Sequence, residues 1–99
     1  MTETYTNGIW DVKDGEEEAF VAAWTTFVTW AGEQAGSRTF RLVRDVDNPR
    51  RYMSFAPWDD RETQAQWKAL PEFPERIGRV RAHCTNFEPS VFELVTAVG

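Results

Sequence analysis

The sequence predicts an α+β fold of the ferredoxin-like type, with the element order β-α-β-β-α-α-β. Three observations predict it. Two strand-like stretches, 38–45 and 51–58, are separated only by a turn and therefore form a hairpin. A helical pattern precedes this hairpin and two shorter ones follow it, and a further strand-like stretch lies near each end of the chain. An antiparallel sheet with helices packed on one face accommodates that order.

The hairpin is the central feature. Its turn contains Asp47, Asn48 and Pro49, whose side chains favour turns. Neither strand has a purely polar face, because apolar residues occur at positions of both parities: Phe40, Leu42, Val43, Tyr52, Met53 and Phe55. Both faces of the sheet should therefore be covered, one by helices and the other, most simply, by the same sheet of a second copy. We expect a homodimer.

The first strand is expected at 5–12, with a helix after it that runs to about Gln34. Asp14 is the expected cap of that helix, with Glu17 three residues later as in a capping box. Apolar residues at three- and four-residue spacing form a stripe that should face the sheet: Phe20, Trp24, Phe27, Val28 and Ala31. Trp30 is expected at the edge of this stripe.

A short helix is expected after the hairpin, at 60–68. Asp59 and Asp60, with Glu62 after them, are typical of a helix start, and Trp67 is the residue expected to anchor this helix to the core. Leu70 and Pro71 should end it.

A third helix should open at Pro74, because proline is tolerated in a first helical turn. Its apolar face is expected to hold Phe73, Ile77, Val80 and Cys84. The last strand is expected at 87–98, with Pro89 near its start, where a missing hydrogen-bond donor does least harm.

Composition excludes several classes of function. At 99 residues the chain should form one domain, and its net charge of −5 argues against nucleic-acid binding. Arg76, Arg79 and Arg81 form only a local cluster, which is typical of a solvated helix face. No apolar run reaches the ~20 residues that a membrane helix needs, and no secretion signal is evident at the start. The expected location is the cytoplasm.

Reactive side chains are few. The single cysteine, Cys84, excludes an intrachain disulfide, and no metal-ligand or nucleotide-binding pattern is present. His83 adjoins Cys84, but neighbours on a helix point about 100° apart, so a Cys–His nucleophile pair is not expected. The five Trp, seven Phe and two Tyr are unusual for this length. Most should be core, yet they could also line a pocket for a flat apolar ligand.

Four segments of the chain resemble the antibiotic biosynthesis monooxygenase family of dimeric α/β-barrel proteins: VKDGEEEAFVAAW (12–24), RLVRDVDNPRRYMSFAPWDD (41–60), WKALPEFPERI (67–77) and FELV (92–95). Core aromatics, turns and caps carry the resemblance more than reactive groups do. It implies a homodimer of facing sheets, with a pocket in each subunit between sheet and helices.

The resemblance implies two possible chemistries. In the cofactor-independent monooxygenases, which oxidise polycyclic phenols and anthrones to quinones with O₂, a strand-end Trp matches Trp58. The Asn expected four positions before it is Ser54, and a Tyr expected six positions after it is Gln64. In the haem-degrading branch a helical Trp matches Trp67, but the haem-ligating His falls at Ile77, which cannot bind iron. Haem degradation is therefore not expected.

The resulting hypothesis is a monooxygenase that acts on an aromatic polyketide-like phenol, anthrone or quinol without metal or flavin. Trp58 and Ser54 are the expected catalytic residues, and Tyr52, Trp67 and Gln64 the expected substrate-binding residues. The alternative is a non-catalytic dimer of the same fold that binds small molecules or serves a stress response.

Overall fold

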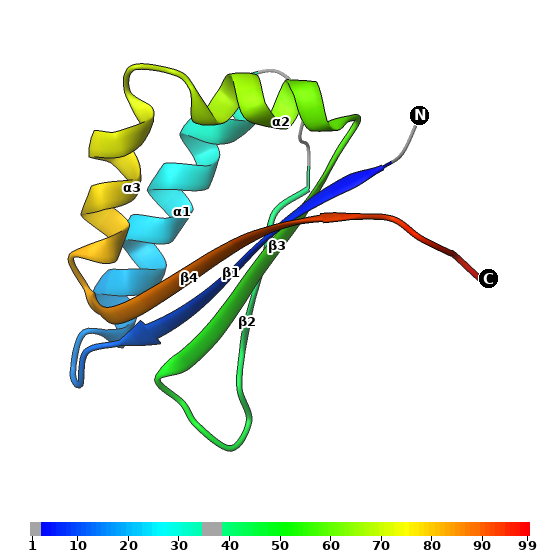
Figure 1. Ribbon diagram of the computed structural model, residues 1–99. Helices are drawn as coiled ribbons and strands as arrows, with labels where there is room; N and C mark the ends of the chain where they lie inside the picture. Colours follow the sequence, from blue (N-terminus) through cyan, green and yellow to red (C-terminus); the bar gives the residue numbers. More distant parts are fainter. Residues whose placement is uncertain (1–2, 35–38) are drawn as a thin grey trace.

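The computed structural model describes residues 3–34 and 39–99 and has the predicted element order (Figure 1). The elements are β1 (Thr4–Val12), α1 (Glu17–Glu33), β2 (Arg41–Arg44), β3 (Arg51–Trp58), α2 (Arg61–Lys68), α3 (Phe73–Arg81) and β4 (Cys84–Glu93). This is the α+β, ferredoxin-like fold that the sequence predicted.

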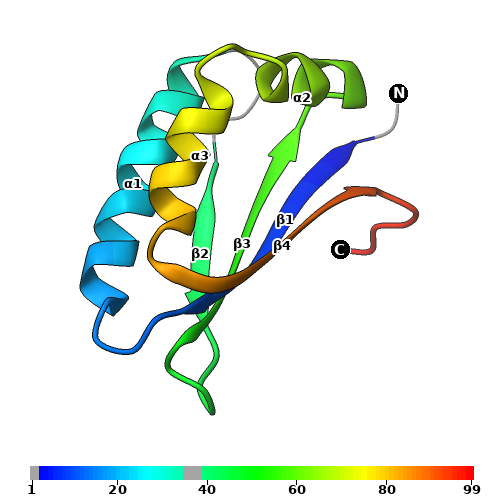
Figure 2. The ribbon, with the colours of Figure 1, turned by 60° about the vertical axis from the view of Figure 1, so that its left-hand side comes forward.

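The four strands form one antiparallel sheet in the order β2-β3-β1-β4. All three helices lie against the same face of this sheet, with α1 and α3 side by side and α2 across one end (Figures 1 and 2). None of the helices among the described residues is long and apolar enough to cross a membrane.

The two faces of the sheet differ in what covers them. Residues facing the helices are buried in the core: Trp10, Val12, Tyr52, Ala56 and Trp58. The opposite face, which we call the open face, carries Val43, Met53, Phe55 and Phe92, and each of these side chains is between 36 % and 53 % exposed. The prediction that the hairpin strands carry apolar residues on both faces is confirmed, and the chain alone leaves the apolar open face uncovered.

The start of α1 differs from the prediction. Its N-cap residue is Glu16, without a side-chain cap, so the predicted cap at Asp14 is wrong. Gly15 adopts the left-handed conformation, with φ of +82°. The backbone N–H of Glu16 donates to the carbonyl of Lys13, so a turn separates Asp14 from the helix. Glu17 and Glu18 in the first helical turn still complement the helix dipole.

The buried face of α1 is wider than expected. Phe20, Trp24, Phe27 and Ala31 are buried as predicted, whereas Val28 is only partly buried. Trp30, expected at the edge, is 7 % exposed. The reason is α3, which packs beside α1 and places the Arg76 guanidinium 4.9 Å from the centre of the Trp30 ring. This tertiary contact has no signature in the spacing of α1.

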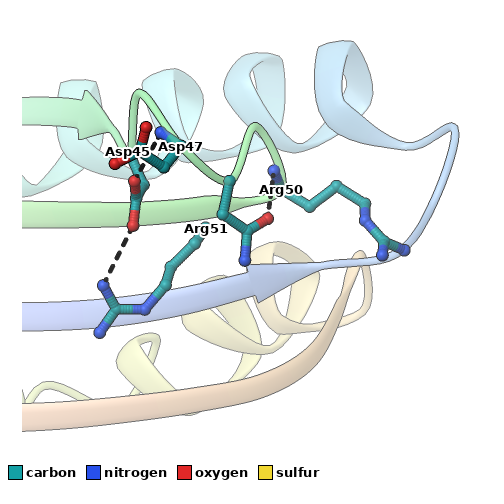
Figure 3. A network of polar contacts seen from close by, with 5 residues as sticks. Asp45, Asp47, Arg50 and Arg51 are labelled. Carbon is teal, nitrogen blue, oxygen red and sulfur yellow. Dashed lines mark hydrogen bonds and ion pairs between the residues drawn. The ribbon is translucent and has the colours of Figure 1, made fainter.

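The hairpin is observed with a shorter first strand than expected. β3 has the predicted bounds, and β2 ends at Arg44 and begins at Arg41; the predicted start at residue 38 lies outside the described residues. Figure 3 shows the turn, where Asp45 accepts a hydrogen bond from the N–H of Asp47 at 2.8 Å and Asn48 accepts one from the N–H of Arg50 at 3.2 Å. An Asp45–Arg51 ion pair at 3.5 Å closes it.

α3 and β4 meet earlier than predicted. α3 ends at Arg81 and Cys84 is the first residue of β4, so Cys84 does not lie on the helix face with Ile77 and Val80. β4 ends at Glu93, and the predicted range 87–98 is therefore wrong at both ends. Pro89 sits inside the strand, and it is tolerated because β4 is an edge strand that pairs with β1 alone.

α2 is capped by Asp60 rather than Asp59. The Asp60 side chain accepts a hydrogen bond from the Thr63 N–H at 2.7 Å. That backbone N–H, and after it the Thr63 side chain, stabilises the carboxylate and lowers the pKa of Asp60 below its usual value. A carboxyl with a depressed pKa in the folded chain stabilises the fold above its unfolded pKa and loses this effect as the pH falls through the folded pKa.

We therefore expect Asp60→Asn to distinguish the stabilisation that comes from the capping hydrogen bond from the stabilisation that comes from the negative charge. Asn still caps a helix, so the variant should melt slightly below the parent at pH 7. That difference in melting temperature should narrow as the pH falls below about 4, the pKa of an unfolded aspartate, because the parent carboxyl becomes protonated only as the pH approaches its lowered folded pKa. Thermal unfolding of both proteins between pH 3 and pH 7 measures it. A gap that stays constant over this range would contradict the role of the charge.

Candidate active site

A pocket opens between the sheet and the helices. It is bordered by all three helices and by β1, β3 and β4, and the cavity volume open to the centres of water-sized molecules is about 80 Å³. Most of its wall is aromatic: Trp10, Trp24, Phe27, Phe40, Trp67, Phe73 and Phe87. Within the described part of the chain, Lys68 is the one ionisable side chain of this wall, and its side chain is exposed. The pocket therefore suits a flat, apolar molecule.

The predicted site residues fall into two groups. Ser54, Gln64 and Trp67 line the pocket. Trp58 and Tyr52 face the same side of the sheet but lie behind the wall, with exposed fractions of 1 % and 5 %. Trp58 packs against Trp67, with ring centres 4.8 Å apart, so it supports a residue of the wall.

Ser54 is held by a tryptophan that sequence analysis did not single out. The Trp10 indole N–H donates to Ser54 Oγ at 2.9 Å. A hydroxyl has one proton to donate and two lone pairs to accept. Because Trp10 occupies a lone pair, the Ser54 proton stays available, and no acceptor for it is recorded among residues 3–34 and 39–99.

Thr6 repeats this arrangement on β1. The Trp58 indole N–H donates to Thr6 Oγ1 at 3.0 Å, and Thr6 lines the pocket. Within the same two described stretches, the Thr6 hydroxyl likewise has no recorded acceptor. Thr6 and Ser54 thus give the wall two hydroxyls that each accept a hydrogen bond from a buried indole.

Gly8 lies where a side chain would collide with the first of these pairs. A Cβ built on it would be 2.9 Å from Phe87 Cε1 and 3.0 Å from both Ser54 Oγ and Trp10 Nε1. The Phe87 and Trp10 rings are stacked at 3.8 Å, so neither can move away easily. Glycine is thus required at this position by close approach.

α2 contributes further polar groups. Gln64 is 5 % exposed, and it is a buried amide on the pocket side of the helix. The Trp67 indole N–H is fully buried and has no hydrogen-bond partner among the described residues. Trp67 is fixed by aromatic neighbours, with Phe73 edge-on at 4.8 Å and Phe27 at 5.8 Å. Lined in this way, the pocket offers hydroxyl, amide and indole donors to a ligand.

His83 and Cys84 do not line the pocket, and their side chains have different partners. His83 Nδ1 lies 2.9 Å from Glu16 Oε1, and Cys84 Sγ lies 3.7 Å from the carbonyl oxygen of Val80. Burial raises the pKa of the Cys84 thiol to about 11, so it is protonated at neutral pH. The described residues contain no group of three or more His, Cys, Asp or Glu side chains that could hold a metal ion. Ile77, by contrast, lies in the pocket wall, where it offers hydrocarbon only.

Sequence analysis missed Thr6, Gly8 and Trp10. They follow one another at every second position of β1, and alternate residues of a strand share a face. The signal available was a glycine inside a strand, which often marks a close backbone approach. It could not be read without the partner strands that place Ser54 and Phe87 opposite.

Solved structures with this fold include oxygenases. A variant of SnoaB, a cofactor-independent oxygenase from Streptomyces nogalater, matches with a TM-score of 0.88 and 22 % identity, over 97 % of this chain and 96 % of that one. A protein from Shewanella oneidensis matches with a TM-score of 0.82 and 20 % identity, over 97 % and 94 % of the two chains. A conserved protein from Methanosarcina mazei matches with a TM-score of 0.82 and 14 % identity, over 93 % and 92 %. At these identities the likeness shows the fold.

No curated protein matches the sequence. The family model for antibiotic biosynthesis monooxygenase, however, matches residues 6–77, which include most of β1, all of α1, the hairpin and α2, and the pocket-lining half of α3. That range covers most of the chain and all of the polar pocket residues named above. The chain belongs to the antibiotic biosynthesis monooxygenase family.

Proposed function

We propose that the protein oxidises a flat, acidic aromatic molecule, such as a polycyclic phenol, anthrone or quinol, with O₂ and without metal or flavin. The observation that carries the proposal is the character of the pocket. Its wall combines aromatic surface with hydroxyl and indole donors and contains no carboxylate, histidine or thiol among the described residues. Such a wall favours the anion of an acidic ring system over its neutral form.

In the proposed reaction the substrate is its own reductant. It loses a proton to solvent, and the hydroxyl donors stabilise the resulting phenolate or enolate oxygen. The carbanion passes one electron to O₂, and the two radicals combine to form a carbon–oxygen bond. The resulting peroxide anion takes a proton back from solvent, and the hydroperoxide then loses water to leave a carbonyl. One oxygen atom enters the product, and the other leaves in water with the two hydrogens of the oxidised carbon. No outside reductant is needed.

Two comparisons support this chemistry. The family is that of antibiotic biosynthesis monooxygenases, and SnoaB is described as a cofactor-independent oxygenase. Neither assigns a substrate to this chain. The proposed roles follow the geometry: Ser54 contacts the substrate oxygen, Trp67 and Gln64 contact the ring, and Trp58 and Tyr52 act from behind the wall.

The test is Ser54→Ala, assayed with a hydroxylated anthrone by O₂ consumption and quinone absorbance. Removing a hydrogen bond to a charged oxygen should lower kcat/KM about 10- to 100-fold. Ser54→Asn, which keeps a donor and restores the residue of the oxygenases, should raise turnover. Thr29→Ala is the matched control, because this exposed hydroxyl bonds only within α1, to the Thr25 carbonyl. Equal rates in the parent and Ser54→Ala would refute the site.

A second candidate is a binding protein of the same fold. The lack of a carboxylate, histidine or thiol in the described pocket wall favours it, because binding needs only the donors and the aromatic surface. Quenching of tryptophan fluorescence by an anthraquinone without O₂ consumption from the matching anthrone would identify this function. For either candidate we keep the expectation of a homodimer that acts in the cytoplasm.

A further inference from the structure

We infer that Thr6 and Ser54 form a pair of donors that recognises two oxygen atoms on one edge of a flat ligand, and that Trp58 positions Thr6 for this task as Trp10 positions Ser54. The inference rests on the proposed function for the chemical class of the ligand. It adds a second contact residue and gives Trp58 an indirect role, through Thr6 rather than through contact with the substrate.

The strand register places the two hydroxyls together. Thr6 pairs with Ala56, and Gly8 pairs with Ser54, so Thr6 and Ser54 are diagonal neighbours on β1 and β3. Both lie on the helix side of the sheet and line the same pocket. Diagonal neighbours of an antiparallel pair are about 7–8 Å apart at Cα, a spacing that suits two ligand oxygens better than one shared oxygen.

The indoles decide what the hydroxyls can recognise. Each indole N–H donates a hydrogen bond to its hydroxyl oxygen, with a nitrogen–oxygen distance of 2.9 Å for Ser54 and 3.0 Å for Thr6. The hydroxyl proton is then the group that still needs a hydrogen-bond acceptor. A ligand that brings acceptors, such as carbonyl or phenolate oxygens, satisfies both protons. A ligand that brings only donors would leave them unpaired.

The indoles themselves are immobile. Trp10 is stacked on Phe87 at 3.8 Å, and Trp58 lies between Trp67 at 4.8 Å and Phe40 at 6.2 Å. Trp58 is 1 % exposed and does not line the pocket, so a ligand meets Thr6 and not the indole. The tryptophan therefore fixes the threonine hydroxyl before the ligand arrives, which lowers the entropy lost on binding.

Binding of two probes tests the inference without turnover. One is a dihydroxyanthraquinone with its oxygens on one edge, and the other is an anthracene with a single hydroxyl; both are titrated by tryptophan fluorescence or calorimetry. Thr6→Val keeps the shape of the side chain and removes its hydroxyl. It should weaken binding of the dihydroxyanthraquinone about fivefold to tenfold and binding of the monohydroxyanthracene about twofold or less. Thr6→Ser, which keeps the hydroxyl, should bind both as the parent does.

Trp58→Phe tests whether Trp58 positions the Thr6 hydroxyl or only packs in the core. It should weaken binding of the dihydroxyanthraquinone about as much as Thr6→Val does. In the Thr6→Val background it should cause no further loss of affinity, because both changes remove the same ordered hydroxyl. Equal losses for both probes, or losses that multiply in the double variant, would overturn the inference. If Thr6→Val does not fold, the probe dependence of Trp58→Phe alone decides.

The outcome is independent of the oxygenase proposal. A protein that binds the dihydroxyanthraquinone through Thr6 and Ser54 but consumes no O₂ would support the donor pair and refute the reaction. Turnover of an anthrone with unchanged probe binding in Thr6→Val would support the reaction and refute the pair.

Discussion

At micromolar concentration the protein should scatter light as a particle of about twice its 11.4 kDa chain mass. The reason is the open face, where Val43, Met53, Phe55 and Phe92 would otherwise remain in water. Phe55 lies inside this face, because β3 pairs with β1 on one side and β2 on the other. Phe55→Glu should therefore reduce the mass to that of one chain, since dimerisation would bury an unpaired charge.

The matched control for this prediction is Val46→Glu. Val46 is 95 % exposed and lies in the turn between β2 and β3, outside the sheet. Val46→Glu adds the same charge as Phe55→Glu and should leave the dimer intact. Circular dichroism of Phe55→Glu should show a folded monomer, because this side chain is already 36 % exposed in the single chain. A parent protein that elutes and scatters as a monomer would rule the dimer out.

Gly8→Ala should cost the protein about 1–3 kcal/mol of stability and most of its ligand affinity, since overpacking a tight site displaces its neighbours. The added Cβ would meet Phe87, Ser54 and Trp10 at 2.9–3.0 Å. Relief requires the Ser54 hydroxyl or the Trp10 indole to shift, and either shift disturbs the hydrogen bond between them. Chemical denaturation gives the stability, and titration with an anthraquinone gives the affinity.

Gly78→Ala provides the comparison. Gly78 lies in α3, and a Cβ there would meet nothing within 4 Å. Alanine favours a helix over glycine by about 1 kcal/mol, so this variant should be as stable as the parent or more stable, with unchanged binding. If both variants behave alike, the close approach at Gly8 is not what the site depends on.

The sequence predicted most of the fold because the strongest local signals agreed with the tertiary structure. β3 has its predicted bounds, since turn residues precede it and the Asp60 cap follows it. The alternation of Met53 and Phe55 with Tyr52 and Ala56 likewise predicted the two faces of the sheet. These features depend on neighbours in the chain.

Other features depend on contacts between distant segments. Trp30 is buried by α3, and Cys84 begins β4 because Val12 of β1 pairs with it. No spacing rule within one element could have indicated either outcome. The failure of Asp14 as a cap has a local cause, because Gly15 takes a left-handed turn before the helix begins.

The structure places the five predicted site residues at or near one pocket. Ser54, Gln64 and Trp67 line the pocket, whereas Trp58 and Tyr52 stand behind it. A sequence pattern locates a tryptophan on a strand but not the hydroxyl that its N–H meets, and Thr6 is far from Trp58 in the chain. The roles of all five residues stay predictions until the variants are assayed.

The position of β1 at the centre of the sheet also has a consequence for how the chain folds. β1 is made first, yet Trp10 pairs with Tyr52 of β3 and Phe87 of β4, which are synthesised much later. Contacts of such long sequence separation slow folding, typically to milliseconds or longer. Until residues 84–93 leave the ribosome, one edge of β1 has no strand to pair with. A nascent chain halted before that point would expose this edge, where unwanted pairing with other chains can begin.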